Sequence, residues 1–430
     1  MTRSGNTTPP KSSILPHSVR TDVEDLLGPV DEHLARSYPG EPATRQPVHT
    51  VYVPGHRYHR GLAHQWGEQA LESIRSHGGM AAVLDAAGVG EDLREAVAAK
   101  VQAKLTTEPI EDLRIDFEDG YTRPGAAEDD DVRSAAQHLR AEIDAGQRTP
   151  FVGIRFKCLE RATRDRGLRT LELFLTTLVQ MADGGGHRDL PAGLNLTLPK
   201  VSVPAQVQAM VTICEALEEA LGLAARRLHF EVQIETPQAV LGADGAASVA
   251  QMVHAGAGRV SGLHYGTYDY SASLGIAGAY QSMEHPAADH AKAVMQLAAA
   301  GTGVRLSDGS TNVLPVGSAE QVQQAWALHA RLVRRSLERG FYQGWDLHPA
   351  QLPTRFAATY AFYREGLAGA ASRLRNYLAG EQGAVLDEPA TARALAWFLL
   401  RGLDCGAVDP GELVDLAGAD REVLVELVNR

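Results

Sequence analysis

The chain has 430 residues, of which 44% are apolar, and this is enough for one large domain with appended segments. Its formal net charge is −12, with no basic stripe interleaved with aromatic residues and no run of about 18 apolar residues, so we expect neither a nucleic-acid partner nor a membrane span. The three cysteines lie far apart, which argues against a disulfide framework or a structural zinc site and favours a reducing, cytoplasmic location.

Residues 1–46 are predicted to form a leader that contains one helix. The start of the chain is polar and proline-rich and lacks the apolar segment of a secretory signal, so we interpret it as a mobile leader. A helix is predicted near 20–36, and the turn Tyr38-Pro39-Gly40 ends it.

From residue 50, short β-rich runs alternate with longer stretches of helical composition. This alternation predicts an α/β fold with a parallel sheet, and eight such units over 47–365 are typical of a TIM-type (β/α)₈ barrel. An open, doubly wound sheet is the alternative, but no glycine-rich phosphate turn follows Pro54-Gly55 after the first run. The eight runs are 50–54, 113–118, 151–156, 194–199, 228–235, 259–265, 303–307 and 342–348.

Other stretches are helical in composition. The long gap 56–112 is predicted to hold two or three helices, and 366–430 is predicted to be a helical extension that packs on a neighbouring subunit or caps the barrel. The acidic run 128–131 opens a predicted helix. Because acidic residues stabilise a helix N-terminus, we favour a solvated cap over a metal site there.

Nearly every predicted strand ends in a polar residue. In a barrel, the carboxyl ends of the strands meet at one mouth, where active sites lie. A ring of charges there is either a salt-bridge network that stabilises the fold or a site, and we favour a site because burying many unpaired charges is costly. In strand order the residues are Asp116, Glu118 and Asp119; Arg155 and Lys157; Lys200; Glu235; Asp269; Asp308; and Asp346 and His348.

Glu235 and Asp269 follow neighbouring strands and suit one divalent cation. Two carboxylates fit a hard cation that keeps several waters, so we expect Mg²⁺, with Mn²⁺ as the alternative. No HxxxH, HExxH or cysteine cluster competes for zinc or iron. Three histidines after the first strand are interpreted as loop residues rather than ligands: His56, His59 and His64.

Arg155 and Lys200 supply positive charge at the same mouth. Arg155 offers a planar fork for a carboxylate. Lys200 either adds charge to the site or neutralises the acids after the second strand. A Lys200 Schiff base is the less favoured alternative, because so many acids nearby should keep the amine protonated.

Several of these residues lie in short motifs that recur in order along the chain. Together the motifs resemble the citrate lyase β-subunit and HpcH/HpaI aldolase family, which also includes malyl-CoA lyases, over residues 48–356. They are VPG at 53–55, DFEDGY at 116–121, GIRF around Arg155, LPK at 198–200, QIETP at 233–237, GTYDYSASLG at 266–275, SDG at 307–309 and GWDLHPAQL at 344–352.

The resemblance implies a Mg²⁺-dependent carbon–carbon lyase or aldolase on a TIM barrel, which in this family commonly forms trimers or hexamers. Glu235 and Asp269 match the family's metal ligands, and Arg155 matches the arginine that contacts the substrate carboxylate or enolate. Catalytic roles are therefore expected for Arg155, Glu118, Asp119 and Lys200, and substrate-binding roles for Arg155, Asp116, Asp308 and His348.

The chain departs from the family pattern in two respects. Four residues, 237–240, lie between the IET motif and Leu241-Gly242, where the family usually reads IETxxG, and no basic patch for coenzyme A is visible. A free oxo- or hydroxy-carboxylic acid is therefore favoured as substrate over its coenzyme A thioester. The alternatives are a malate-synthase-like condensing enzyme or thioesterase, and a non-catalytic barrel that serves as a binding protein.

Overall fold

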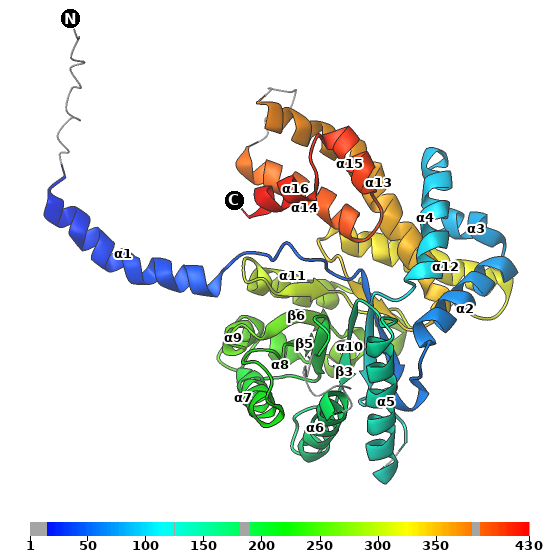
Figure 1. Ribbon diagram of the computed structural model, residues 1–430, viewed down its shortest axis with the longest axis horizontal. Helices are drawn as coiled ribbons and strands as arrows, with labels where there is room; N and C mark the ends of the chain where they lie inside the picture. Colours follow the sequence, from blue (N-terminus) through cyan, green and yellow to red (C-terminus); the bar gives the residue numbers. More distant parts are fainter. Residues whose placement is uncertain (1–14, 124, 181–189, 381–387, 430) are drawn as a thin grey trace, which may run out of the picture.

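Eight parallel strands form a barrel in the computed structural model, which describes residues 15–123, 125–180, 190–380 and 388–429 (Figure 1). Neighbouring strands pair in the order β7-β6-β5-β4-β3-β2-β1-β8. A parallel bridge between Ser307 and Gln343 closes the barrel between β7 and β8. The predicted TIM-type (β/α)₈ barrel is therefore confirmed. The strands are β1(His49–Pro54), β2(Asp112–Asp116), β3(Phe151–Arg155), β4(Leu194–Leu198), β5(Phe230–Ile234), β6(Val260–Tyr265), β7(Arg305–Ser307) and β8(Gly344–Asp346).

Helices connect successive strands and cover the outside of the barrel. The first connection holds three α-helices, within the predicted range. The acidic run 128–131 lies at the start of α5 as predicted, but Glu128 is buried rather than solvated and accepts a 2.7 Å hydrogen bond from Thr170 Oγ1 of α6. The helices up to the last strand are α2(Leu62–Ser76), α3(Gly79–Ala86), α4(Arg94–Thr107), α5(Ala126–Asp144), α6(Arg164–Gln180), α7(Pro204–Leu221), α8(Pro237–Val240), α9(Ser248–Ala255), α10(Thr267–Ser273), α11(Pro286–Ala299) and α12(Ala319–Glu338).

The interior of the barrel is filled by polar and charged side chains. Arg114 of β2 reaches across the interior, where Nη2 donates a 2.8 Å hydrogen bond to Glu231 Oε2 of β5 and Nε donates a 3.1 Å bond to Thr197 Oγ1 of β4. His264 Nε2 of β6 lies 3.1 Å from the same Glu231 oxygen. Barrel interiors are more often packed with branched aliphatic residues. Here hydrogen bonds satisfy the buried charges instead.

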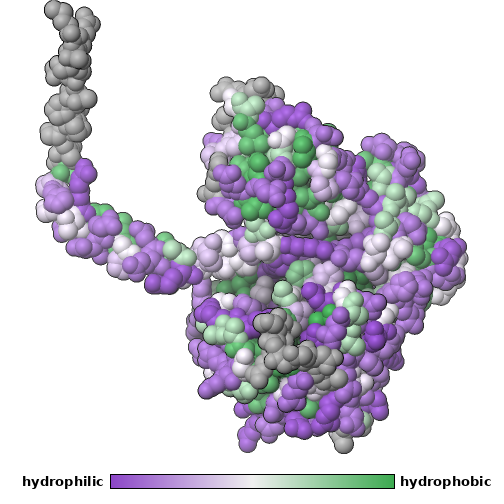
Figure 2. Space-filling model, viewed as in Figure 1, coloured by the Kyte–Doolittle hydropathy of each residue, from purple (hydrophilic) through white to green (hydrophobic). Residues whose placement is uncertain are grey.

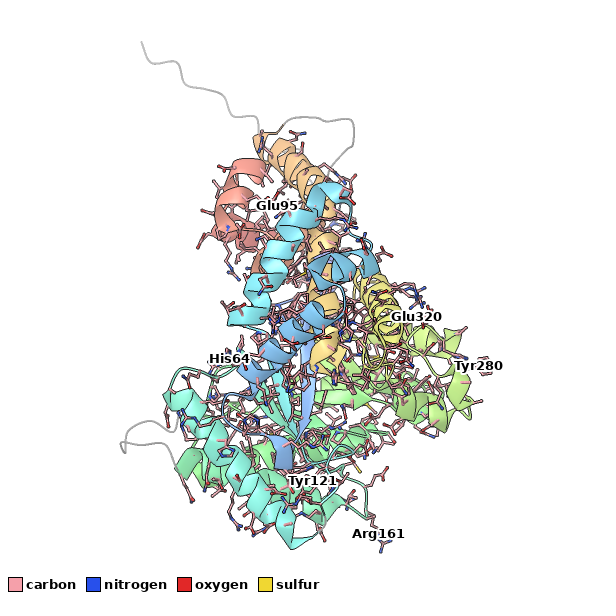
Figure 3. The ribbon with its side chains drawn as sticks, turned by 90° about the vertical axis from the view of Figure 1, so that its right-hand side faces the viewer. His64, Glu95, Tyr121, Arg161, Tyr280 and Glu320 are labelled. Atoms are coloured by element: carbon pink, nitrogen blue, oxygen red, sulfur yellow. The ribbon has the colours of Figure 1, made fainter. Side chains whose placement is uncertain are left out.

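The C-terminal helices form a second apolar layer beside the barrel. They pack with α2, α3, α4 and α12 around a hydrophobic cluster that includes Trp326, Phe356 and Leu399. Figure 3 shows α2 and α4, marked by His64 and Glu95, alongside the long helix α13. The expected boundary between 365 and 366 lies inside this helix. The layer consists of α13(Leu352–Ala379), α14(Pro389–Asp404), α15(Pro410–Ala417) and α16(Arg421–Val428).

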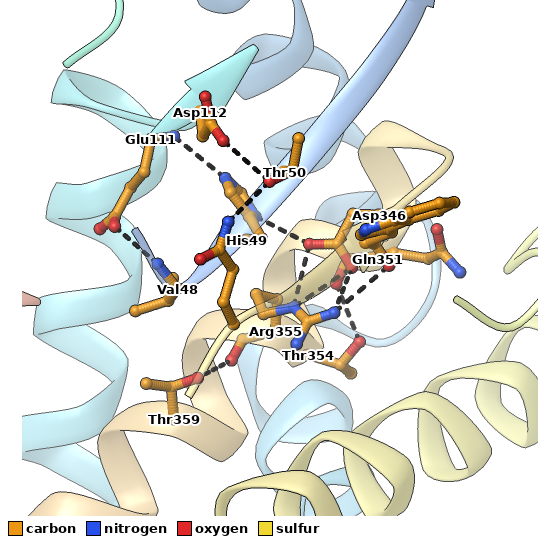
Figure 4. Close-up of polar contacts among 12 residues, drawn as sticks. Val48, His49, Thr50, Glu111, Asp112, Asp346, Gln351, Thr354, Arg355 and Thr359 are labelled. Carbon is orange, nitrogen blue, oxygen red and sulfur yellow. Dashed lines mark hydrogen bonds and ion pairs between the residues drawn. The ribbon is translucent and has the colours of Figure 1, made fainter. Parts of the chain in front are cut away.

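A buried polar network ties β8 to β1 and to α13 (Figure 4), and His329 links the network to α12. Asp346 accepts hydrogen bonds from His49 Nδ1 at 2.7 Å, from His329 Nε2 at 3.0 Å and from Arg355 Nη2 at 2.9 Å. The Glu111 main-chain N–H donates to His49 Nε2 at 3.1 Å, so the His49 proton lies on Nδ1. Burial raises the pKa of Asp346, but Arg355 and the two histidines outweigh burial and hold the pKa well below its usual value.

The N-terminal arm consists of α1(His17–Ser37), which confirms the helix predicted near 20–36. Figure 1 shows this helix extending away from the rest of the molecule. The chain then runs along the body, where the Tyr38 ring meets His254 edge-on at 5.6 Å and Glu41 pairs with Arg401. The start of the predicted leader, 1–14, lies outside the described residues. Among the helices that the structure describes, none is long and apolar enough to cross a bilayer.

Candidate active site

Asp116 and Arg155 end two adjacent strands at the carboxyl mouth of the barrel. They are register partners on β2 and β3, and Arg155 donates two hydrogen bonds of 2.7 Å, from Nε to Oδ1 and from Nη2 to Oδ2 of Asp116. Asp116 also accepts the main-chain N–H groups of Glu118 and Gly120, each at 2.9 Å. A Cβ at Gly120 would lie 2.4 Å from Asp116 Oδ2, so this close turn requires glycine. Asp116 thus fixes the plane of the guanidinium.

Tyr52 of β1 supports Arg155 from inside the barrel. The guanidinium carbon of Arg155 lies 4.7 Å from the centroid of the Tyr52 ring, which is a cation–π contact. Gln233 Nε2 donates a 3.2 Å hydrogen bond to the Tyr52 hydroxyl. Tyr52 was not predicted from the sequence, although strand alternation places it on the same face of β1 as Thr50 and Pro54.

Glu235 follows β5 and is 2% exposed. Its Oε1 accepts the main-chain N–H of Lys200 at 2.7 Å. Gly266 lies directly beside it, since a Cβ at Gly266 would approach Glu235 Oε2 to 2.6 Å. Burial raises the pKa of Glu235 to about 7, and the charge of Asp269 adds to the rise against the opposing effect of Arg155.

Lys200 contributes its main chain and its side chain to different acids. It has a φ of +51°, in the left-handed region that L-residues rarely adopt. Its Nζ lies 2.7 Å from Asp119 Oδ1 and 3.4 Å from Glu118 Oε1. Burial lowers the pKa of the ammonium, but the hydrogen bond to Asp119 and the charge of Glu118 outweigh burial and raise it. A protonated amine is not the nucleophile that a Schiff base requires.

Glu118 and Asp119 are neighbours with opposite pKa shifts. Burial and the charge of Asp119 raise the pKa of Glu118 to about 7, against the opposing effect of Lys200. The pKa of Asp119 is lowered, because its hydrogen bond to Lys200 outweighs burial. Glu118 is therefore the group of this pair that can exchange a proton near neutral pH.

Asp269 lies in the first turn of α10, directly after β6, and part of its side chain is exposed to solvent while the rest is covered. Burial of its carboxylate and the charge of Asp119 raise its pKa, while Lys200 and Arg155 oppose the rise. Because the charge of Asp269 also raises the pKa of Glu235, these two carboxylates repel each other across the mouth. We call the group Asp116, Glu118, Asp119, Arg155, Lys200, Glu235 and Asp269 the mouth cluster; its five carboxylates outnumber its two cations.

A hard divalent cation fits the chemistry of this cluster. All of its possible metal ligands are carboxylate oxygens. The pKa values of Glu235 and Asp269 are raised, and a nearby cation would lower them again. Among the described residues no three His, Cys, Asp or Glu side chains converge to form a closed metal site. Two carboxylates with water in the remaining positions are the arrangement that Mg²⁺ favours.

Asp308 and His348 form hydrogen bonds with residues outside the mouth cluster. Asp308 is buried between helices, where its carboxylate accepts Lys292 Nζ at 2.9 Å and Ser336 Oγ at 2.7 Å. His348 is half-buried at the start of the short turn after β8, and its Nδ1 accepts the N–H of Ala350 at 3.2 Å. The structure therefore brings seven of the nine predicted site residues together and gives these two local partners.

A cavity of about 660 Å³ opens at the opposite, amino-terminal mouth of the barrel. Residues at strand starts line it, among them Asp112, Phe151, Asn195 and Val260. The candidate site at the carboxyl mouth is thus marked by its charges and hydrogen bonds rather than by the size of a cavity.

Several solved structures are similar to this chain at low sequence identity. A citrate lyase from Burkholderia xenovorans LB400 is 20% identical with a TM-score of 0.56, over 87% of this chain and 97% of that chain. A Haloferax volcanii malate synthase is 14% identical with a TM-score of 0.47, over 90% and 99%. The CitE protein of Mycobacterium tuberculosis, solved with magnesium, acetoacetate and coenzyme A, is 18% identical with a TM-score of 0.44, over 85% and 100%.

The similarity to the citrate lyase structure extends over nearly the whole of both chains and agrees with the barrel described above. No curated protein matches the sequence significantly. One family model covers most of the chain, residues 27–430. The chain therefore belongs to the family described as a domain of unknown function, DUF6986.

Proposed function

We propose that this protein is a Mg²⁺-dependent carbon–carbon lyase or aldolase that acts on an oxo- or hydroxy-carboxylic acid through an enolate. The observation that carries the proposal is the arrangement of the mouth cluster. An arginine held by two hydrogen bonds to Asp116 lies near Glu235 and Asp269, and within the described residues neither of these carboxylates forms an ion pair with a side chain. Cleavage of a bond beta to a carbonyl needs positive charge where the enolate develops.

Glu235 and Asp269 would hold the cation, Mg²⁺ or alternatively Mn²⁺. When bound, the cation supplies Lewis-acid stabilisation of negative charge on a carbonyl oxygen. The Lys200 N–H fixes one oxygen of Glu235, which leaves Oε2 on the side of Gly266. The ordered carboxylate costs less to organise when a ligand arrives.

Arg155 would bind the substrate carboxylate and stabilise the enolate. Its Nε and Nη2 groups serve Asp116, and its Nη1 group makes no hydrogen bond within the described residues. The ring of Tyr52 and the carboxylate of Asp116 hold the guanidinium in one plane before substrate binds. Such preorganised donors can lower a barrier by several kcal/mol.

Glu118 would transfer the proton. In the cleavage direction a base must remove the proton of the substrate hydroxyl, and in the reverse direction the same group returns it. A pKa of about 7 suits Glu118 to both tasks, whereas the lowered pKa of Asp119 suits it to hold Lys200. Of these two acids, Glu118 is therefore the one that we propose as the base.

A substrate panel tests the proposal. The full chain with Mg²⁺ is incubated with free hydroxy- and oxo-acids and with their coenzyme A thioesters, and released oxo-acid and free thiol are measured separately. We expect oxo-acid without thiol, and loss of turnover after chelation and in Glu235→Gln. Release of thiol would instead favour a condensing enzyme or thioesterase. Metal binding that Glu235→Gln abolishes, without turnover of any compound, would favour a non-catalytic binding protein.

A further inference from the structure

The helix α1 carries an exposed apolar stripe. No residue of this 21-residue helix is buried against the described chain, and Figure 2 shows apolar atoms on the surface of the projecting arm. At 100° per residue, six apolar side chains fall within an arc of about 100°. Their exposed fractions range from 40% to 70%: Val19, Val23, Leu26, Leu27, Val30 and Leu34.

The spacing of the stripe is that of a helix that pairs with another helix. Val23 and Val30 are seven residues apart, as are Val19 and Leu26, and the two pairs interleave at steps of three and four. These are the a and d positions of a heptad repeat, where side chains pack between two helices. The helix breakers Gly28 and Pro29 lie outside the stripe.

An antiparallel pairing of two copies also satisfies the charges. In an antiparallel pair, a positions of one helix face d positions of the other, so Leu26 packs against Val30 of the partner subunit and Val30 against the partner's Leu26. The flanking residues then meet as well. This register places Asp22 opposite the partner's Arg36, and the two-fold axis repeats the contact.

The same helix is poorly suited to a lipid surface. Interfacial helices usually carry Lys and Arg on the polar face, because anionic headgroups attract them. Asp22, Glu24, Asp25, Asp31 and Glu32 give the polar face of α1 an acidic character instead. An acidic helix whose apolar stripe matches itself points to a second copy of this chain.

We propose that α1 is a dimerisation helix, which pairs antiparallel with α1 of a second copy and holds two barrels together. Because α1 lies beyond the amino-terminal mouth and the mouth cluster lies at the carboxyl mouth, the pairing is independent of the proposed catalytic site. The wild-type protein therefore exists in solution as an even multiple of the 46.1 kDa chain.

Mass measurement on the full chain tests the pairing. Leu26 is 70% exposed, so Leu26→Asp would be harmless if α1 met only solvent. We expect Leu26→Asp to halve the mass found by sedimentation or light scattering at micromolar concentration. Thr21→Asp, on the opposite face of the same helix, is the matched control and should keep the wild-type mass. An odd-numbered wild-type mass, or equal masses for wild type and Leu26→Asp, would overturn the proposal.

A charge exchange tests the register. Within one helix Asp22 and Arg36 are separated by about 21 Å, too far to interact directly. Asp22→Arg and Arg36→Asp should each weaken the dimer at least several-fold, and the double variant should restore it. Failure of the double variant to restore the dimer would overturn the antiparallel pairing. Co-sedimentation of a monomeric wild type with phosphatidylglycerol vesicles would overturn the proposal in favour of a lipid surface.

Discussion

Lys200 and Glu235 are joined through the main chain: the Lys200 N–H donates a 2.7 Å hydrogen bond to Glu235 Oε1, and Lys200 adopts a φ of +51° to do so. The left-handed conformation of a non-glycine residue costs on the order of 1–3 kcal/mol and persists where its surroundings impose it. The contact does not depend on the lysine side chain. The backbone of Lys200 therefore orients Glu235, the proposed metal ligand. Its ammonium separately lowers the pKa values of Glu118 and Asp119.

Removing only the ammonium should shift the pH dependence of the reaction. In Lys200→Met the main-chain contact to Glu235 remains, but Glu118 loses the cation that opposes the rise of its pKa. The pKa of Glu118 should then move above about 7, and because the base must be ionised, the acid limb of the pH–rate profile should move to higher pH. Lys100→Met, on distant α4, should leave the profile unchanged. An unshifted limb in Lys200→Met would contradict the role of Glu118.

Replacing Arg155 by lysine should reduce kcat on the order of 100-fold, the loss typical for removal of one preorganised donor. A lysine keeps the charge but cannot make both hydrogen bonds to Asp116 or stack in one plane on Tyr52. Steady-state kinetics on the active compound would measure the effect, with circular dichroism to show that the fold is intact. Arg133→Lys on the exposed face of α5 is the control, and near-native kcat in Arg155→Lys would refute the role.

Asp269→Asn should abolish Mg²⁺ binding without weakening the fold. The raised pKa of Asp269 means that its charge destabilises the folded, metal-free protein above that pKa, so the neutral amide should keep or raise Tm in the presence of chelator. Added Mg²⁺ should raise Tm of the wild type, since it binds the native state, and leave Asp269→Asn unchanged. Titration calorimetry that finds equal Mg²⁺ affinity for the two proteins would count against Asp269 as a ligand.

Gly266→Ala should weaken Mg²⁺ binding although residue 266 is not a ligand. An added Cβ would lie 2.5 Å from Glu235 Cβ and 2.6 Å from Oε2, so the Glu235 side chain or the backbone at position 266 must shift. We expect at least a ten-fold loss of affinity by calorimetry. Gly278→Ala, which meets no atom within 4 Å, should bind Mg²⁺ like the wild type. Equal affinity of both variants would show that the position of Glu235 is not critical.

The barrel and all seven residues of the mouth cluster were predicted from the sequence for the same physical reason. Parallel strands separated by helices place their carboxyl ends at one mouth, so the residues after each strand could be grouped without coordinates. Tyr52 was not predicted as a site residue because it lies inside a strand, where only the alternation of side chains between the two faces indicates its position. Asp308 was expected at the site, but its carboxylate meets Lys292 and Ser336 of the outer helices, and such helix partners cannot be read from the strand.

The charged interior of the barrel constrains how the sequence can change. Arg114 pairs with both Asp112 and Glu231, and His264 also contacts Glu231, so Arg114 and His264 compensate the desolvation of the two carboxylates. Removal of one partner from such a buried set costs about 3–5 kcal/mol, whereas joint replacement by apolar residues of similar volume is often neutral. We therefore expect covariation among homologues at positions 112, 114, 231 and 264. A substitution at one of these positions should be tolerated only when its partners change with it.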